Sequence, residues 1–130
     1  VNIFDCDSLV DRKSTFAAFL CTGSSSEAQL HWALRRLLER PKIAKATHNM
    51  RAHRFVEGGV VKADNEDDGE DGAGYKIAHL LDLFKTTDVL VVVSRWYGGI
   101  KLGPDRFKHI AKLTQRALEA HGYLRPRAAS

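Results

Sequence analysis

Apolar residues recur at helical spacing in three segments of the chain, residues 24–40, 74–84 and 104–121. The positions expected to face a core are Leu30, Ala33, Leu34 and Leu37 in the first segment, Ile77, Leu80, Leu81 and Phe84 in the second, and Phe107, Ile110, Ala111, Thr114, Ala117 and Leu118 in the third. Each segment therefore predicts an amphipathic helix with one face for a core and one for solvent.

Capping signals mark the ends of two of these helices. Ser24 followed three positions later by Glu27 matches a capping box, in which the two side chains satisfy free backbone N–H groups. Pro104 suits the start of the third helix, and Gly122 suits the left-handed residue that closes a helix. These signals support the helix limits that the apolar spacing indicates.

Runs of β-branched and aromatic residues predict strands over residues 1–4, 14–21, 46–56, 60–63 and 89–93. The first two are joined by a short polar connection, and the third and fourth flank a Gly-Gly pair that is typical of a hairpin turn. The last run is entirely apolar, as expected of a strand covered on both sides. We therefore predict that it lies inside the sheet rather than at an edge.

The order β-β-α-β-β-α-β-α predicts an α+β domain, a two-layer sandwich with a mixed or antiparallel sheet and helices on one face. We expect one domain over residues 1–124 and a frayed tail over 125–130. The longest apolar run is far shorter than the roughly 20 residues that cross a bilayer, so no membrane contact and a cytoplasmic location are expected. The chain begins at Val1 without methionine or a signal segment, and the sequence leaves open its oligomeric state and whether it is part of a longer protein.

Charge is distributed unevenly along a chain of ordinary globular composition, 44% hydrophobic and 28% charged. The net charge is +4, but residues 64–71 hold six acids and no lysine or arginine, so the remainder carries +10. Such a surface suits RNA or an acidic protein face, and it equally suits solubility alone. Cys6 and Cys21 have no zinc-binding spacing and are expected to be reduced thiols.

The acidic stretch resembles a calcium-binding loop only in part. Asp64, Asp68 and Gly69 fit the first, fifth and sixth positions of that loop, but Glu66 and Tyr75 stand where other ligands are required. We therefore assign no metal site and no cofactor to the chain. The favoured interpretation is a solvated loop whose last acids cap the helix that follows Gly72, ahead of a partner-binding lip and, last, a metal site.

His48 and Asn49 lie in a predicted strand and are expected to make structural hydrogen bonds. The alternative is catalytic. A hairpin could bring His48 beside Asp67, Asp68 or Glu70 as an acid/base pair, which would make the chain a hydrolase. No nucleophile elbow or histidine metal motif accompanies them, so we assign no catalytic residue.

The segment from Ser94 to Phe107 follows a buried strand and opens a helix, where free N–H groups and a helix dipole favour an anion. It is no Walker motif, because Pro104 replaces the required lysine. Cations beside aromatic rings suit phosphate contact and base stacking, although the rings could also be partly core and the glycines could only form the turn. The candidate ligand-binding residues are Arg95, Trp96, Tyr97, Gly98, Gly99, Lys101 and Arg106, with His48, Asn49, Asp68 and Glu70 on the adjoining rim.

Four motifs that together cover nearly the whole chain carry a family resemblance. They are Lys13-Ser14-Thr15-Phe16, Ala46-Thr47-His48-Asn49, Asp67-Asp68-Gly69-Glu70 with Ala73-Gly74, and the long run from Val91 to Ile110 that includes Arg-Trp-Tyr-Gly-Gly and Gly-Pro-Asp-Arg-Phe. They closely resemble the IMPACT N-terminal domain family, which includes the IMPACT/Yih and YigZ-like proteins.

This resemblance implies a fold like that of the second domain of a small-subunit ribosomal protein and domain IV of elongation factor G. It also implies a non-enzymatic module linked to translation or its regulation. The implied partner is RNA or a translation-associated protein. Because a shared fold does not establish a shared function, these are expectations for the site to support or oppose.

Overall fold

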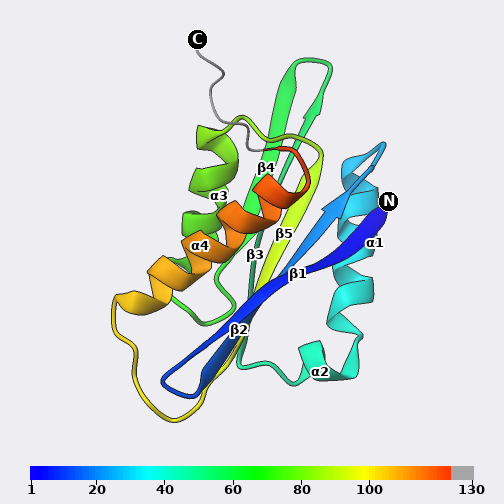
Figure 1. Cartoon of the computed structure of the whole chain (residues 1–130). Helices are drawn as coiled ribbons and strands as arrows, with labels where there is room; N and C mark the ends of the chain where they lie inside the picture. Colours follow the sequence, from blue (N-terminus) through cyan, green and yellow to red (C-terminus); the bar gives the residue numbers. More distant parts are fainter. Residues whose placement is uncertain (124–130) are drawn as a thin grey trace.

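The computed structural model describes residues 1–123, which form a five-stranded antiparallel sheet with helices packed against it (Figure 1). The elements are β1 (Asn2–Asp11), β2 (Ser14–Thr22), α1 (Glu27–Leu38), α2 (Pro41–Ala44), β3 (His48–Glu57), β4 (Val60–Glu66), α3 (Ala73–Leu83), β5 (Val89–Trp96) and α4 (Asp105–Ala120). The strand order is β1-β2-β5-β3-β4, and every neighbouring pair is antiparallel. The predicted α+β class and antiparallel sheet are confirmed, and the predicted tail lies outside the described residues.

The apolar run 89–93 lies in β5, the central strand of the sheet, as predicted. Val91 and Val93 are fully buried, because β2 and β3 flank β5 and its side chains face a core on each side. The strand continues to Trp96, three residues beyond the apolar run. Arg95 and Trp96, expected at the start of a loop, are therefore strand residues that point to opposite faces of the sheet.

Helices cover both faces of the sheet, which corrects the expectation of a two-layer sandwich with helices on one face. Helices α3 and α4 pack over the face that carries Met50 and Val91. Helix α1 packs over the opposite face, against Leu90 and Val92. A central strand that is apolar at every position from 89 to 93 needs a hydrophobic cover on each side, which one helical layer cannot supply.

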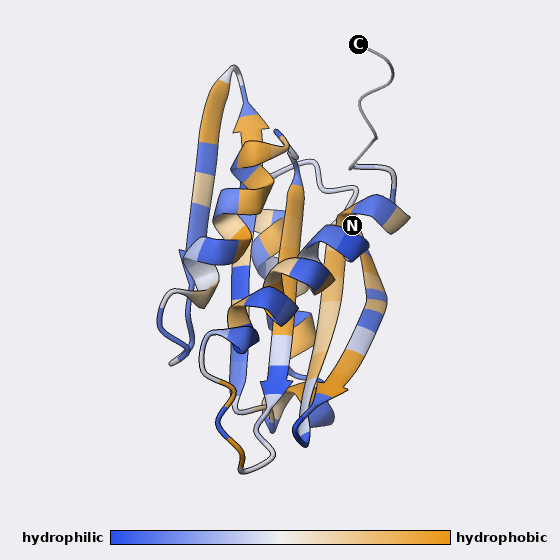
Figure 2. Ribbon diagram, turned by 60° about the vertical axis from the view of Figure 1, so that its left-hand side comes forward, coloured by the Kyte–Doolittle hydropathy of each residue, from blue (hydrophilic) through white to orange (hydrophobic). Residues whose placement is uncertain are grey.

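The hydropathy colouring of Figure 2 shows how these layers meet. Some strands carry long apolar stretches and others are interrupted by polar residues, and apolar and polar residues alternate along the helices. The helices therefore turn one stripe to the sheet and the other to solvent, as their spacing predicts. None of the helices in residues 1–123 is long and apolar enough to cross a membrane.

Turn and capping residues in the sequence predicted the ends of most helices and strands to within a few residues of their observed positions. Arg12 and Lys13 have positive φ angles of 43° and 69°, as expected of a two-residue hairpin turn between β1 and β2. The start of α4 follows Pro104 directly. Gly122, with φ of 80°, follows α4, and the amide of Tyr123 donates to the Leu118 carbonyl, which closes the helix end.

Two local predictions were wrong. The first strand extends to Asp11 rather than ending at Phe4, because β1 is an edge strand with no buried residue, and its polar residues hide its pattern. The cap of α1 is Ser26, whose hydroxyl accepts from the amide of Gln29, rather than Ser24. Glu27 is therefore the first residue of the helix, and its carboxylate does not close a capping box.

Candidate functional site

A cavity of about 330 Å³ lies where the end of β5, the acidic turn after β4 and the approach to α4 meet. We call it the arginine pocket. It is lined by Thr47, His48, Glu70, Arg95, Tyr97, Lys101, Leu102, Gly103 and Arg106. Six of the residues predicted from the sequence thus meet in one pocket, although they come from three separate parts of the chain.

Arg95 forms the floor of the pocket and is a buried cation. Its Nη1 donates to Glu70 Oε2 at 2.6 Å, and the two side chains are only 6% and 9% exposed. The Arg95 guanidinium carbon also lies 5.3 Å from the ring centroids of both Phe16 and Tyr97. The arginine thus contacts two aromatic rings and is neutralised by Glu70, so its first role is to hold the pocket together.

Glu70 is shared with a second arginine. Arg106 Nε lies 3.0 Å from Glu70 Oε1, and Arg106 Nη1 donates to the Gly103 carbonyl at 2.8 Å. The Nε–H groups of Arg95 and Arg106 are nevertheless buried without a hydrogen-bond acceptor among residues 1–123, so the 3.0 Å approach is charge proximity rather than a directed hydrogen bond. Such groups retain donor capacity at the pocket.

His48 lies beside Glu70 on the rim of the pocket. Its Nδ1 is 2.8 Å from the carbonyl oxygen of Asp68, and because a carbonyl can only accept, His48 Nδ1 is the donor. Its Nε2 is 3.9 Å from Glu70 Oε2. The backbone of the acidic turn therefore orients the imidazole toward the shared carboxylate.

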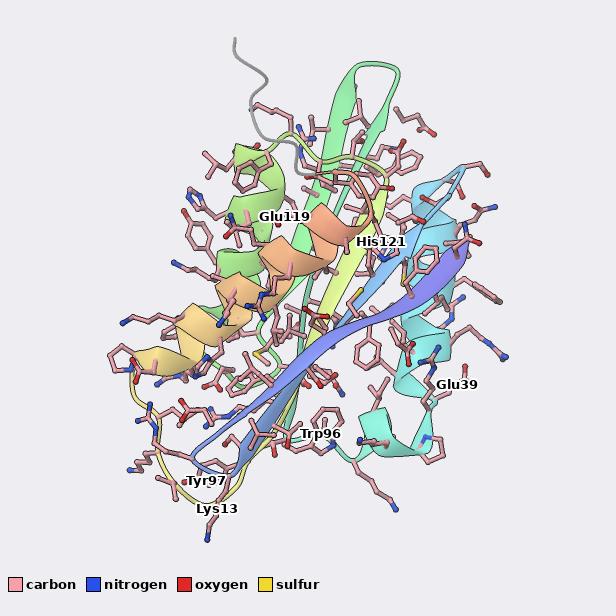
Figure 3. All side chains as sticks on the ribbon, viewed as in Figure 1. Lys13, Glu39, Trp96, Tyr97, Glu119 and His121 are labelled. Carbon is pink, nitrogen blue, oxygen red and sulfur yellow. The ribbon has the colours of Figure 1, made fainter. Side chains whose placement is uncertain are left out.

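Exposed groups complete the mouth of the pocket. Lys101 is exposed and has no ion-pair partner in the described part of the chain, and Tyr97 is 47% exposed with its ring over Arg95. Figure 3 shows Tyr97 and Lys13 at the same end of the molecule. Three cations, those of Arg95, Lys101 and Arg106, therefore line the pocket together with one carboxylate, that of Glu70. The pocket thus presents an excess of positive charge to solvent.

Gly98 holds the β1–β2 turn against the segment that follows β5. A β-carbon at Gly98 would lie 2.0 Å from the carbonyl oxygen of Lys13, and the Gly98 amide donates to Ser14 Oγ at 3.2 Å. Gly99 has φ of 92°, a conformation that favours glycine. These two predicted site residues thus shape the backbone at the pocket mouth.

Trp96 lies outside the arginine pocket, on the other face of β5. Its Nε1 donates to the Lys42 carbonyl at 3.1 Å, and Lys42 Nζ lies 5.4 Å from the ring centroid. The expectation that Trp96 and Tyr97 stack side by side on one surface is therefore not the arrangement found, because Tyr97 lines the arginine pocket whereas Trp96, the last residue of β5, lines a different hollow.

Asn49 and Asp68 support the pocket from outside. The Asn49 side chain donates to the Ile43 carbonyl at 3.0 Å and accepts from Ser94 Oγ at 2.6 Å, which ties α2 to β5. Asp68 Oδ2 accepts from the Asn49 amide at 2.7 Å. Both residues thus fix the backbone that carries His48 and Glu70.

The carboxylates proposed for a hydrolase are all committed to other bonds. Asp67 accepts from the amides of Gly72 and Gly74 at 3.0 and 2.7 Å and so caps α3, whereas the sequence interpretation gave that role to the last acids of the stretch. Asp68 binds a backbone amide and Glu70 binds arginine. This arrangement gives the hydrolase alternative no support.

Sequence reasoning missed Ser14, at the start of β2, and Thr47, just before β3, which both bind residues of the pocket segment. Ser14 Oγ accepts from Gly98 and, at 3.4 Å, from Arg95, and Thr47 Oγ1 accepts from the Tyr97 amide at 2.9 Å. Both belong to motifs that carried the family resemblance, which was the one available signal for them.

Asp11 clamps the β1–β2 turn to α4 next to the pocket. Hydrogen bonds from Arg12 and then His109 lower the pKa of Asp11 from 3.8 to about 2. A carboxyl with a depressed folded-state pKa stabilises the fold above its unfolded pKa and loses that contribution as pH falls through the folded value.

We therefore expect Asp11→Asn to lower the free energy of unfolding at pH 5. Between pH 3.8 and about 2, the variant should lose less of its free energy of unfolding than the wild type does. Urea unfolding of both proteins across this pH range measures the effect. An unchanged pH dependence in the variant would contradict the clamp.

An open antiparallel sheet with helices on both faces and a cationic pocket at one end defines a small α+β domain of known architecture. Residues 12–118 match the Impact N-terminal domain family, and the chain belongs to that family. Among curated relatives, Protein IMPACT of Danio rerio is 48% identical over 119 residues, covering 90% of this chain and 37% of that protein. The Protein IMPACT homolog of Schizosaccharomyces pombe is 44% identical over 115 residues, covering 88% of this chain and 41% of that protein.

Two solved structures have similar folds. The two-domain translational regulator Yih1 aligns with a TM-score of 0.63 and 40% identity, covering 92% of this chain and 46% of the Yih1 chain. A hypothetical protein aligns with a TM-score of 0.72 and 25% identity, covering 88% of this chain and 56% of that protein. The chain thus spans about half or less of the length of these relatives.

Proposed function

We propose that this chain is a non-catalytic module of a cytoplasmic translation regulator and that its arginine pocket binds a phosphate group of RNA. The support for the regulatory role is family membership together with the similarity to a two-domain translational regulator. The observation that carries the binding role is the positive excess of the pocket, with three cations to one carboxylate. Phosphate is the anionic group that RNA presents along its whole length.

Each pocket residue has a distinct role in this proposal. Glu70 holds Arg95 rigid, so the phosphate meets Arg106 and Lys101, whose side chains reach the mouth of the pocket. Half-exposed Tyr97 stacks on a neighbouring base. The helix end of α4 contributes less than its position suggests, because its first turn carries the carboxylate of Asp105.

Single-stranded RNA is favoured over an acidic protein because a cation and an exposed ring stand side by side. Arg95 and Tyr97 are stacked at 5.3 Å, and such a pair can serve as a platform for a base beside a phosphate contact. A carboxylate-bearing protein would use the cations but would not need the ring. Removing the Tyr97 ring should therefore weaken the binding of RNA but not that of an acidic protein, which distinguishes the two partners.

Replacing Lys101 with alanine is expected to make the salt dependence of RNA binding shallower by roughly 0.7 in the logarithmic slope, since one phosphate contact is lost. Filter binding of single-stranded RNA across a salt series measures this slope. Lys85→Ala is the matched control. Lys85 is an exposed lysine just before β5, beyond the end of that strand opposite the pocket, and its replacement should leave the slope unchanged.

Tyr97→Ala serves as the second arm of this experiment. It should weaken binding by about 1–3 kcal/mol with no change in slope, because stacking releases no counterions. Absence of RNA binding at low salt, or equal effects of Lys101→Ala and Lys85→Ala, would contradict the proposal. Binding of an acidic peptide that depends on Lys101 but not on Tyr97 would favour a protein partner instead.

A further inference from the structure

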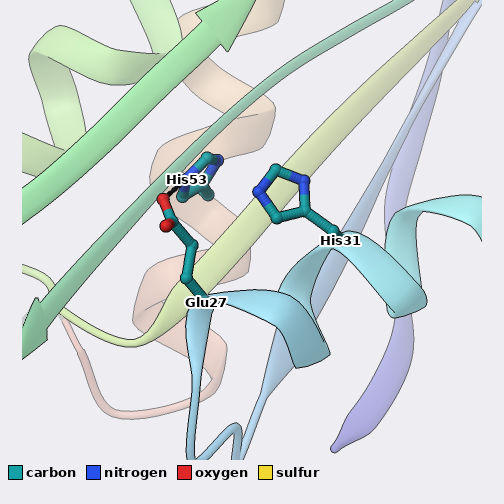
Figure 4. Close-up of side chains that lie close together, drawn as sticks. All are labelled: Glu27, His31 and His53. Atoms are coloured by element: carbon teal, nitrogen blue, oxygen red, sulfur yellow. Dashed lines mark hydrogen bonds and ion pairs between the residues drawn. The ribbon is translucent and has the colours of Figure 1, made fainter.

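Two histidines and a glutamate meet on the face of the sheet that α1 covers, away from the arginine pocket (Figure 4). Glu27 and His31 lie one turn apart on α1, and His53 points at them from β3. Their ligand atoms all lie within 4.8 Å of one another. No sequence motif indicates this cluster, because His53 is far from the other two along the chain and only the fold brings it to them.

From this geometry we propose that Glu27, His31 and His53 bind one Zn²⁺ ion. Two imidazole nitrogens and one carboxylate oxygen are a common zinc donor set, and a fourth position remains for water. Tetrahedral zinc with bonds of about 2.0–2.2 Å holds its ligand atoms roughly 3.3–3.5 Å apart. The site therefore needs only small side-chain adjustments, which the exposed His31 can make.

The surroundings hold two of the three ligands in place. His53 is 7% exposed, and its Nε2 already lies 2.8 Å from Glu27 Oε2 in a hydrogen bond that the metal would replace. Glu27 is fixed at the start of α1, because Ser26 caps the helix immediately before it. The imidazole rings of His31 and His53 are 5.1 Å apart between centroids, edge to face.

A hollow of about 210 Å³ beside the cluster gives a cation access. Asp64 and Glu66 line it and attract a cation, and Arg51 lines it and opposes one. Asp64 is the residue that pairs with His53 across β3 and β4, so the two side chains lie on the same face of the sheet. Leu30 and Leu90 form part of the apolar base, which limits the movement of the ligands.

Calorimetric titration of the tag-free 130-residue chain with ZnCl₂ tests the proposal. One Zn²⁺ should bind per chain, and His31→Ala and Glu27→Gln should each weaken binding at least about tenfold, the lower end of the loss seen when residues that merely support a metal ligand are changed. His31 is exposed, so its replacement should leave the fold intact. His79→Ala is the matched control, since His79 is an exposed helix histidine that stacks on Tyr75 and lies outside the cluster.

Urea unfolding provides a second measurement. Zn²⁺ joins α1 to β3 only in the folded chain, so it should raise the unfolding midpoint of the wild type and of His79→Ala but not of His31→Ala. No Zn²⁺ binding by the wild type would overturn the proposal. Binding that survives both His31→Ala and Glu27→Gln at wild-type affinity would also overturn it.

Discussion

Replacing Glu70 with glutamine is expected to lower the free energy of unfolding by about 3–5 kcal/mol, because it leaves a buried arginine without its counter-charge. Arg95 is 5% exposed, and Glu70 Oε2 accepts its hydrogen bond at 2.6 Å. The amide of glutamine fills the same space but carries no charge to offset the desolvation of the guanidinium. Urea denaturation monitored by circular dichroism measures the loss.

A surface pair is the matched control for this experiment. Lys62 Nζ and Glu57 Oε1 are 3.1 Å apart on the β3–β4 hairpin, and both side chains are well exposed. Glu57→Gln should therefore cost at most about 1 kcal/mol. Replacing Arg95 with methionine in the Glu70→Gln protein should recover part of the loss, because it removes the unpaired charge. A cost for Glu70→Gln no larger than that of Glu57→Gln would contradict the role of Glu70.

Gly98→Ala is the second change with a large expected effect. The added β-carbon would meet the Lys13 carbonyl oxygen at 2.0 Å and the carbonyl carbon at 2.2 Å, so two backbone segments must separate. Overpacking of this kind costs about 1–3 kcal/mol and occasionally more, and the upper part of that range is expected because neither partner is a flexible side-chain end. Urea denaturation measures the cost. The amide resonance of Ser14 should also shift, since its hydroxyl accepts from the Gly98 amide.

Gly59→Ala provides the comparison. Gly59 also lies in a turn, with φ of 78°, but a β-carbon there meets nothing within 4 Å. Its replacement should cost only the roughly 1–2 kcal/mol of a left-handed alanine and leave the Ser14 resonance in place. Equal costs at both glycines, with no shift at Ser14, would show that the β1–β2 turn does not need close contact with Gly98.

Much of the fold could be predicted because its signals are local. The apolar stripes of α1, α3 and α4, the Gly-Gly hairpin between β3 and β4 and the all-apolar run of β5 each depend on residues close in the chain. Such periodic patterns reflect the geometry of a single element, so they can be read without knowing its neighbours. The placement of α1 on the second face could not be predicted this way, since an amphipathic helix does not specify which side of a sheet it covers.

The features of the candidate site can likewise be divided into those that the sequence determined and those that only the fold decided. By itself the sequence determined the chemical groups, a run of cations and aromatics near Arg95 and acids near Glu70, and it determined the family through its motifs. Only the tertiary structure decided that Glu70 neutralises Arg95, that Trp96 faces away from Tyr97 and that His53 meets Glu27. Residues that meet in such contacts are tens of positions apart in the chain, and neighbouring strand residues such as Arg95 and Trp96 lie on different faces of the sheet. Which groups meet therefore depends on strand order and on which face each residue occupies, and both are properties of the assembled sheet.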